Sequence, residues 1–163
     1  MTKQQQQQKQ EIYGILKQDH DEVTELFQQV KEAKGDAASE LFQQIKLKLV
    51  PHSRAEEAEF YEPLLKQKRT ADKIRESREE HLMADALIAE IDALTPRDPE
   101  WIAKVNVLAD VVGHHIDEEE GELFPLARQI LSERETRDIA ERFVASRENV
   151  MHQMSRAEQR GAA

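Results

Sequence analysis

The apolar residues of this chain recur at steps of three and four residues along nearly its whole length, the period of a helix with one buried face. Three short breaks interrupt the pattern. They are Gly35-Asp36, the loop "TPRDP" at 95–99, which ends in a helix-starting Asp-Pro, and "SERE" at 132–135, which has the form of a capping box. No stretch shows the alternation of a half-buried strand. The sequence therefore predicts an all-α protein.

Together with a short gap at 68–69, the breaks divide the chain into five predicted helices. We expect them at residues 9–33, 37–67, 70–94, 99–130 and 133–157. Pro51 and Pro63 should kink or shorten the second of these helices. Long helices joined by short loops predict an up-down antiparallel four-helix bundle over 9–130, with an additional C-terminal helix and tail over 131–163. The glutamine-rich residues 1–8 predict a disordered N-terminal tail.

Composition narrows the class of protein. The chain has 163 residues, 39% of them hydrophobic, which suits one domain with a sizeable core. A net charge of −10 argues against binding nucleic acid or a membrane surface by charge. The absence of cysteine excludes disulfides, thiolate metal sites and iron–sulfur clusters. The sequence shows no membrane-spanning apolar run and no secretory signal, so we expect a cytoplasmic protein. We also expect a monomer or a weak homo-oligomer.

A histidine interrupts the apolar face of each of the first four predicted helices. Two of these histidines are followed, four residues later and therefore on the same helical face, by a glutamate. In "VVGHHIDEEEGELFP" at 111–125, His115 shares the stripe of Val112, whereas His114 points about 100° away around the helix. The residues expected to point inward are His20, His52, Glu56, His81, His115 and Glu119.

The spacing of the four histidines predicts that they meet. The successive gaps are 32, 29 and 34 residues. In an up-down bundle, nearly equal gaps place all four residues near mid-height, each roughly 19 Å from the helix ends at about 1.5 Å per residue. Two carboxylates and four imidazoles buried at one level are unfavourable without compensation. A pair of metal ions supplies it, and oxygen and nitrogen ligands without sulfur suit iron, manganese or zinc.

Two plainer interpretations remain open at this point. Each His-x-x-x-Glu pair can be an ordinary pair on a helix surface, worth a few tenths of a kcal/mol. Alternatively, the chain is a structural bundle in which buried histidines merely pair with glutamates. Two copies of the motif on apolar stripes favour the metal site over both.

Four segments of the chain resemble the hemerythrin-like, or HHE cation-binding, domain family. They are "KQDHDEV" around His20, "HSRAEEAEFYEP" from His52, "EEHLMADAL" around His81 and "HIDEEEGELFP" from His115, and the resemblance covers roughly residues 9–130. It implies that these four histidines are metal ligands and that Glu56 is one of two bridging carboxylates. Glu119 is the other. The implied cofactor is two iron ions with oxo or hydroxo bridges, manganese or zinc being alternatives.

One position departs from the oxygen-carrying hemerythrins, which have a second histidine four residues after the one in the third helix. Here that position is Asp85, which could bind metal directly, hold a water or leave the position open. The resemblance therefore implies a non-haem di-iron protein that binds, scavenges or detoxifies a small ligand: oxygen, nitric oxide or hydrogen peroxide. Whether it is an enzyme stays open. The alternative is an iron store or carrier, or a metal-dependent sensor, without catalysis.

Several neighbours of the predicted ligands are weaker candidates. We expect Glu57 and Glu120 to be exposed, the alternative being that each accepts a hydrogen bond from a ligand imidazole. Tyr13 and Tyr61 should pack in the core with their hydroxyls at its edge, the alternative being that they line the site or donate to a metal-bound oxygen species. His114 is a minor ligand candidate, reachable only if the helix is distorted. His152, the sixth histidine, is expected on the surface.

Overall fold

The computed structural model describes residues 11–161, so the tail predicted at 1–8 lies outside the described residues. All regular elements within the described range are helical, as the sequence predicted. Their bounds are α2 (Ile12–Glu32), α3 (Asp36–Glu56), η1 (Glu57–Tyr61), α4 (Glu62–Leu65), α5 (Ala71–Asp92), α6 (Pro99–Glu118), η2 (Glu119–Leu123), α7 (Phe124–Ala127) and α8 (Glu133–Gly161).

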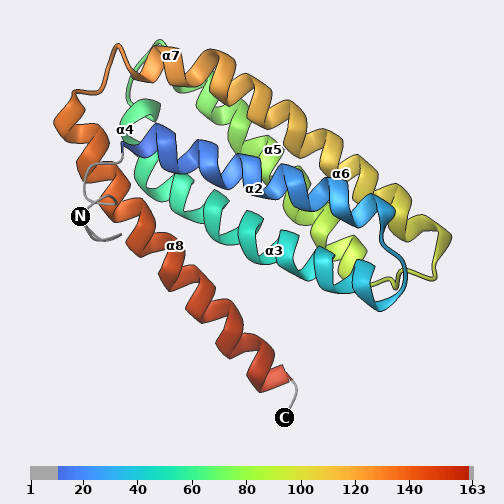
Figure 1. The fold of residues 1–163 in the computed structure, drawn as a ribbon. Coiled ribbons are helices and arrows are strands. Elements are labelled where there is room, and N and C mark those ends of the chain that lie inside the picture. The colour runs from blue at the N-terminus through green and yellow to red at the C-terminus, as the bar shows by residue number, and fades with distance from the viewer. Residues whose placement is uncertain (1–10, 162–163) are drawn as a thin grey trace, which may run out of the picture.

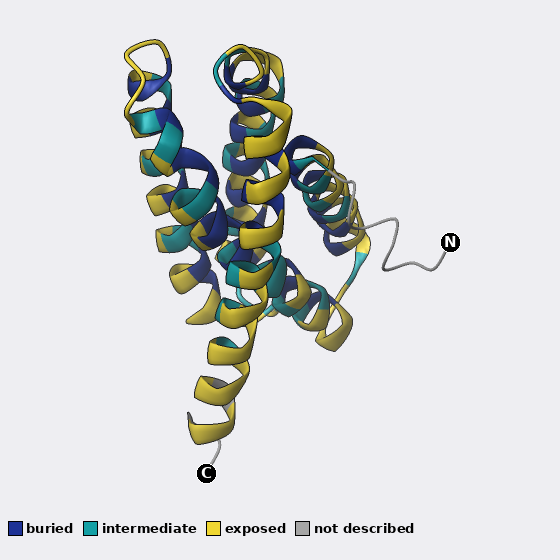
Figure 2. Cartoon of the chain, turned by 90° about the vertical axis from the view of Figure 1, so that its left-hand side faces the viewer, coloured by how far each residue is buried: buried dark blue, intermediate teal, exposed yellow. Residues whose placement is uncertain are grey.

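Helices α2, α3, α5 and α6 lie side by side as an antiparallel bundle (Figure 1). Helix α2 packs against α3 and α6, and α5 packs against α6 and α3, which closes the bundle. The fifth helix, α8, lies outside it, against α3 and α2. The C-terminal part of α8 runs past the bundle and is largely exposed (Figure 2). The predicted up-down antiparallel bundle with an extra C-terminal helix is confirmed.

The predicted helix starts are present, although the side chain of Asp98 does not cap its helix. Ser132 and Glu135 form the capping box, with the Ser132 amide donating to the Glu135 carboxylate at 2.8 Å and the Glu135 amide donating to the Ser132 hydroxyl at 3.3 Å. Asp98 is the residue before α6, but its carboxylate accepts from the amide and hydroxyl of Thr95 rather than from the helix. The loop at 95–98 is thereby closed on itself.

A π-helical turn interrupts both helices that carry a His-x-x-x-Glu motif. Segment η1 directly follows Glu56, and segment η2 begins at Glu119. Pro63 and Pro125 each lie two residues beyond the π segment. Because proline has no amide hydrogen and its ring crowds the carbonyl four residues earlier, a wider turn accommodates it without ending the helix. Helix α3 continues through Pro51, so only the later proline coincides with the predicted kink.

The core consists of two apolar clusters with a polar layer between them. One cluster, at the α4 and α7 end, includes Leu16, Phe60 and Ile74; the other, toward the opposite end, includes Val23 and Ile88. The inward-pointing histidines lie between the clusters, at the mid-height that the spacing predicted. Within the described residues, each helix is either too short or too polar to cross a bilayer.

Candidate metal centre

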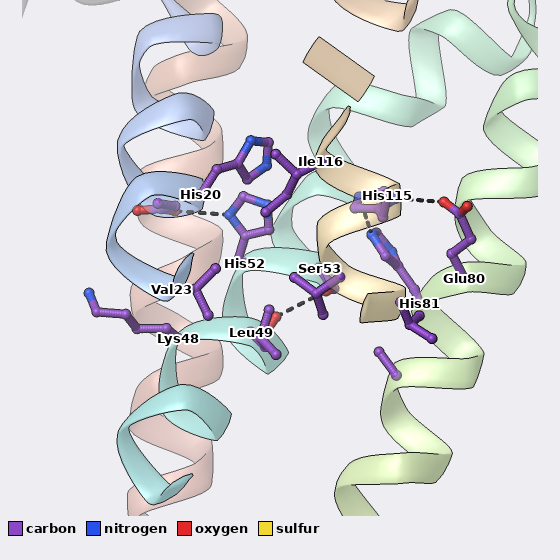
Figure 3. Close-up of a pocket in the computed structure, with 14 residues that line it drawn as sticks. His20, Val23, Lys48, Leu49, His52, Ser53, Glu80, His81, His115 and Ile116 are labelled. Atoms are coloured by element: carbon purple, nitrogen blue, oxygen red, sulfur yellow. Dashed lines mark hydrogen bonds and ion pairs between the residues drawn. The ribbon is translucent and has the colours of Figure 1, made fainter. Parts of the chain in front are cut away.

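Four imidazoles from four helices converge in the middle of the bundle. His20, on α2, and His52, on α3, have ring centroids 5.2 Å apart. His81, on α5, and His115, on α6, bring their Nε2 atoms to 3.3 Å (Figure 3). All four side chains are buried. The structure therefore brings together the four histidines that the sequence singled out.

Glu56 and Glu119 lie between the two histidine pairs. The Oε2 atom of Glu56 is 3.7 Å from Nε2 of His52 and 3.5 Å from Nε2 of His81. The Oε2 atom of Glu119 is 3.2 Å from Nε2 of His20 and 3.8 Å from Nε2 of His115. Each carboxylate thus faces a histidine of both pairs. Two sets of ligand atoms, each within 4.8 Å of one another, share Glu56 between them: His20, His52 and Glu56, and Glu56, His81 and His115.

A second ring of carboxylates surrounds the histidines and fixes their orientation. Each Nδ1 atom lies within hydrogen-bond distance of an acidic side chain on a neighbouring helix. The four pairs are His20 with Glu120 at 2.9 Å, His52 with Asp19 at 3.0 Å, His81 with Glu57 at 2.8 Å and His115 with Glu80 at 2.8 Å. A carboxylate accepts the proton of Nδ1, so the lone pair of each Nε2 points to the interior, the tautomer that ligates a metal.

The site has an approximate two-fold symmetry that relates α2 and α3 to α5 and α6. Tyr61 stacks on His81 with a centroid distance of 5.7 Å, and Phe124 stacks on His20 at 6.3 Å. The two aromatic residues occupy matching places after the two His-x-x-x-Glu motifs. The symmetry is broken because the Tyr61 hydroxyl donates to Glu119 at 2.9 Å, whereas phenylalanine has no such group.

The two central glutamates have opposite electrostatic environments. Burial and the neighbouring charge of Glu119 raise the pKa of Glu56 well above its usual value. Burial also disfavours ionisation of Glu119, but His20 and the other imidazoles outweigh it and lower the pKa of Glu119. Burial opposes protonation of His20, yet its contact with Glu119 raises the pKa of His20 to about 9. Burial lowers the pKa of His52 to about 4.

The donor set fits a cation because it leaves buried polar atoms without partners. Seven buried side-chain atoms of the described residues make no hydrogen bond, and five of them are Nε2 of His20 and of His52, both carboxylate oxygens of Glu56 and Oε2 of Glu119; the other two are the Tyr13 hydroxyl and Nε of Arg78. Each orphaned buried group costs about 1–3 kcal/mol, and native proteins contain few of them. All five atoms belong to the converging cluster. Metal ions bound between them would satisfy every one, and oxygen and imidazole donors suit iron, manganese and zinc.

A small cavity adjoins the imidazoles on the side of the second apolar cluster. Its volume is about 30 Å³. All four histidines line it, and its other walls are mainly apolar (Figure 3). The apolar side chains are Val23, Leu49, Ala84, Val111, Val112 and Ile116. Because a water needs at least about 10–15 Å³ of such space, the cavity accommodates molecules of only a few atoms.

The weaker candidates are placed clearly. Asp85 forms an ion pair with Arg54 at 2.5 Å, and the structure does not bring it into the converging cluster. The side chain of His114 is 66% exposed and faces Glu118 at 3.3 Å. His152 is exposed, as expected. Tyr61 is fully buried and donates into the cluster, so the expectation that its hydroxyl lies at the edge of the core was wrong.

The ring of outer carboxylates is where reasoning from the sequence fell short. Glu57 and Glu120 were expected to be exposed, but both are partly buried and contact ligand histidines. Asp19 and Glu80 were missed altogether. A signal was present, since Asp19 and Glu80 each directly precede an inward histidine and the other two each directly follow an inward glutamate.

Residues 11–127 match the hemerythrin HHE cation binding domain family. The chain belongs to this family. Membership and the converging histidines and glutamates together support metal binding by the bundle. The match ends before α8, so the C-terminal helix lies outside the family domain.

Two known proteins are similar to this member of the family. The crystal structure of a hemerythrin HHE cation binding domain-containing protein from Mycobacterium kansasii superposes with a TM-score of 0.78, at 21% identity, over 88% of this chain and 89% of that one. This likeness shows the fold. A protein from Nostoc sp. named "DNA nickase" is 28% identical over 144 residues, 88% of this chain. The present chain spans only 41% of that relative's length.

Proposed function

We propose that this protein is a non-haem di-iron protein that binds or converts a small ligand: oxygen, nitric oxide or hydrogen peroxide. The observation that carries the proposal is the set of five orphaned donor atoms beside a cavity of about 30 Å³. The donor atoms would bind the metal ions. The cavity would hold a ligand of two to four atoms, since it is too small for an organic substrate.

The residues of the chain divide into three tasks. His20 and His52 would hold one ion and His81 and His115 the other, with Glu56 and Glu119 between them. The outer carboxylates accept the Nδ1 protons and so keep each Nε2 directed inward. Iron bound here would supply Lewis acidity and a redox couple.

The apolar walls of the cavity limit the access of water to the histidines, and Tyr61 orients one of the central carboxylates. Side chains such as Val112 and Ala84 keep bulk water away from the histidines, which strengthens electrostatic interactions inside the cavity. The Tyr61 hydroxyl donates to Glu119 and holds this carboxylate in one orientation. Burial and the two nearby carboxylates raise the pKa of Tyr61, so the hydroxyl keeps its proton at neutral pH.

An iron store or carrier, or a metal-dependent sensor, is the alternative use of the same residues. A store or carrier must release its ions readily, whereas a centre with four carboxylate-supported imidazoles is built to retain them. The buried ligands and the enclosing apolar clusters therefore favour a resident pair of ions over cargo.

DNA nicking, the activity in the name of the Nostoc relative, is not part of the proposal. Most of that relative lies outside the region of similarity. The net charge of −10 gives this chain no electrostatic attraction to a phosphate backbone. Cleavage of supercoiled plasmid by the metal-loaded protein, abolished by His115→Ala, would overturn this judgement.

The proposal is tested by filling the cavity without touching a ligand. Ala84 lines the cavity and Ala86, two residues along the same helix, is exposed. We expect iron-loaded Ala84→Leu to keep its two irons but to bind nitric oxide and decompose peroxide at least tenfold more slowly. Ala86→Leu should match the wild type. Nitric oxide binding is followed by absorption spectroscopy and peroxide loss by oxygen evolution. Equal rates in all three proteins would refute the assignment of the cavity, and no reaction in any of them would refute the function.

A further inference from the structure

Two of the outer carboxylates form ion pairs with a lysine or an arginine, and one of these cations comes from outside the bundle. Glu120 lies 3.5 Å from the Lys17 ammonium, on the neighbouring α2. Asp19 instead contacts Arg147 of α8, whose Nη1 atom is 2.6 Å from Oδ1 and 2.5 Å from Oδ2. This is the single outer carboxylate, among those described above, with a contact to α8. Helix α8 therefore reaches the layer of ligands.

A continuous chain of contacts leads from α8 to the predicted ligand His52. Arg147 holds both oxygens of Asp19, and Oδ2 of Asp19 also lies 3.0 Å from Nδ1 of His52. One turn before Arg147, Phe143 is fully buried and meets the His52 ring edge-on at 5.7 Å. Residues four apart share a helical face, so α8 presents an aromatic ring and a guanidinium to the same histidine.

Because the site is approximately two-fold symmetric, the contribution of α8 can be found by comparing Asp19 with its counterpart in the other half. The counterpart of Asp19 in the other half is Glu80, which is bonded to His115 in the same way. Its neighbouring cation candidate is His114, 3.6 Å away and largely exposed. Arg147 is always charged and its side chain is only a quarter exposed, at 25%. Asp19, which contacts His52, is thus held by a partly buried guanidinium, whereas its counterpart Glu80 has no such partner among the described residues.

We propose that α8 is a working part of the metal centre, in which Arg147 is a positioning residue that acts through Asp19 to hold His52, so that the two halves of the centre retain metal unequally. This inference rests on the proposed metal centre. It assigns a role at the site to a helix beyond the region that matches the family.

The test compares two arginines of α8 that both form ion pairs with the bundle. Arg142 contacts Glu59 at 2.8 Å, and within residues 11–161 Glu59 forms no hydrogen bond or ion pair with a histidine. Arg147→Gln removes the ion pair with Asp19, which contacts His52. Arg142→Gln removes a comparable ion pair, with Glu59, that has no link to a predicted metal ligand. Each protein is loaded with ferrous iron and mixed with a chromogenic chelator, and the release of iron is followed over time.

We expect the wild type to release its iron in two phases, and Arg147→Gln to release the slower half roughly tenfold faster, near the lower end of the effect of removing an outer partner of a ligating histidine. The faster half of Arg147→Gln, and both halves of Arg142→Gln, should leave at their wild-type rates. Arg147→Lys, which keeps the charge, should restore slow release in part. Uniform acceleration of both halves, or identical behaviour of the two glutamine variants, would overturn the proposal.

A measurement on metal-free protein separates this inference from the proposed function. Nitrogen-15 NMR reports whether Nδ1 of His52 carries its proton in a hydrogen bond. We expect the His52 Nδ1–H signal in the wild type and in Arg142→Gln, and its loss or exchange broadening in Arg147→Gln. An unchanged signal refutes the role of Arg147 whether or not the protein binds iron. A wild type without iron refutes only the proposed function.

Discussion

Replacement of Glu56 by leucine distinguishes a metal centre from a structural network of buried ion pairs. Both oxygens of Glu56 are buried without a hydrogen-bond partner, and its side chain is fully enclosed. Leaving a buried polar group unsatisfied costs about 1–3 kcal/mol. Leucine is apolar and of similar size, so it removes this cost without adding a new unsatisfied group. We therefore expect metal-free Glu56→Leu to be about 2 kcal/mol more stable than the metal-free wild type.

The metal should invert this order. A ligand present at about 1,000 times its dissociation constant stabilises the folded state by about 4 kcal/mol. The wild type should gain this stability on loading with iron, and Glu56→Leu, which lacks the shared carboxylate, should gain little. Urea unfolding followed by circular dichroism, with chelator and with iron, measures all four stabilities. A rise of about 2 kcal/mol corresponds to roughly 4–8 °C in Tm for a chain of this size.

Glu59→Leu is the matched control for this experiment. Glu59 lies three residues further along and pairs with Arg142 at the surface, where such a pair is worth about 0–1 kcal/mol. Its loss should change neither the sign nor the size of the iron effect. If Glu56 belongs instead to a structural network, its removal strands buried partners and costs about 3–5 kcal/mol. A metal-free Glu56→Leu that is destabilised by this amount would refute the reasoning.

Three further predictions follow from the same geometry. His115→Ala should lose most of the bound metal, whereas His114→Ala should keep it, as elemental analysis will show; equal losses would mean that the wrong face was chosen. Metal-free protein should lose stability as the pH rises from 6.5 toward 9, because the pKa of His20 is raised to about 9 and that of Glu56 is raised well above its usual value, so the folded state holds protons that the unfolded chain releases; urea midpoints that stay constant over this range would contradict this. Tyr61→Phe removes a buried hydroxyl that donates to a carboxylate and should cost about 1.5–3 kcal/mol in urea unfolding; no change would show that the bond contributes nothing.

The fold and the inner ring of side chains follow from periodicity. His20 and His115 stand on apolar stripes, and the nearly equal gaps between the histidines require a common level in an up-down bundle. These are statements about one helix face and one topology, which a sequence contains directly. The structure accordingly places the six inward residues together.

The outer ring could not be reached by the same reasoning. Asp19 lies about 100° around the helix from the buried face that His20 shares, so periodicity alone assigns it to the surface. It is partly buried because His52 and Arg147, from two other helices, lie against it. Contacts between helices depend on crossing geometry that periodicity does not specify. The π-helical turns after Glu56 and at Glu119 depend in the same way on tertiary packing, although the nearby prolines hinted at a distortion.

The central claim, that the buried histidines and glutamates hold a pair of metal ions, is tested most directly by the metal content of the protein. Elemental analysis should be made on protein purified without chelator or histidine tag, with an absorption spectrum recorded in air. We predict about two irons per chain and the charge-transfer bands of a bridged ferric pair. A protein that contains no metal, and that takes up neither iron, manganese nor zinc on reconstitution, would contradict the account and leave a purely structural bundle.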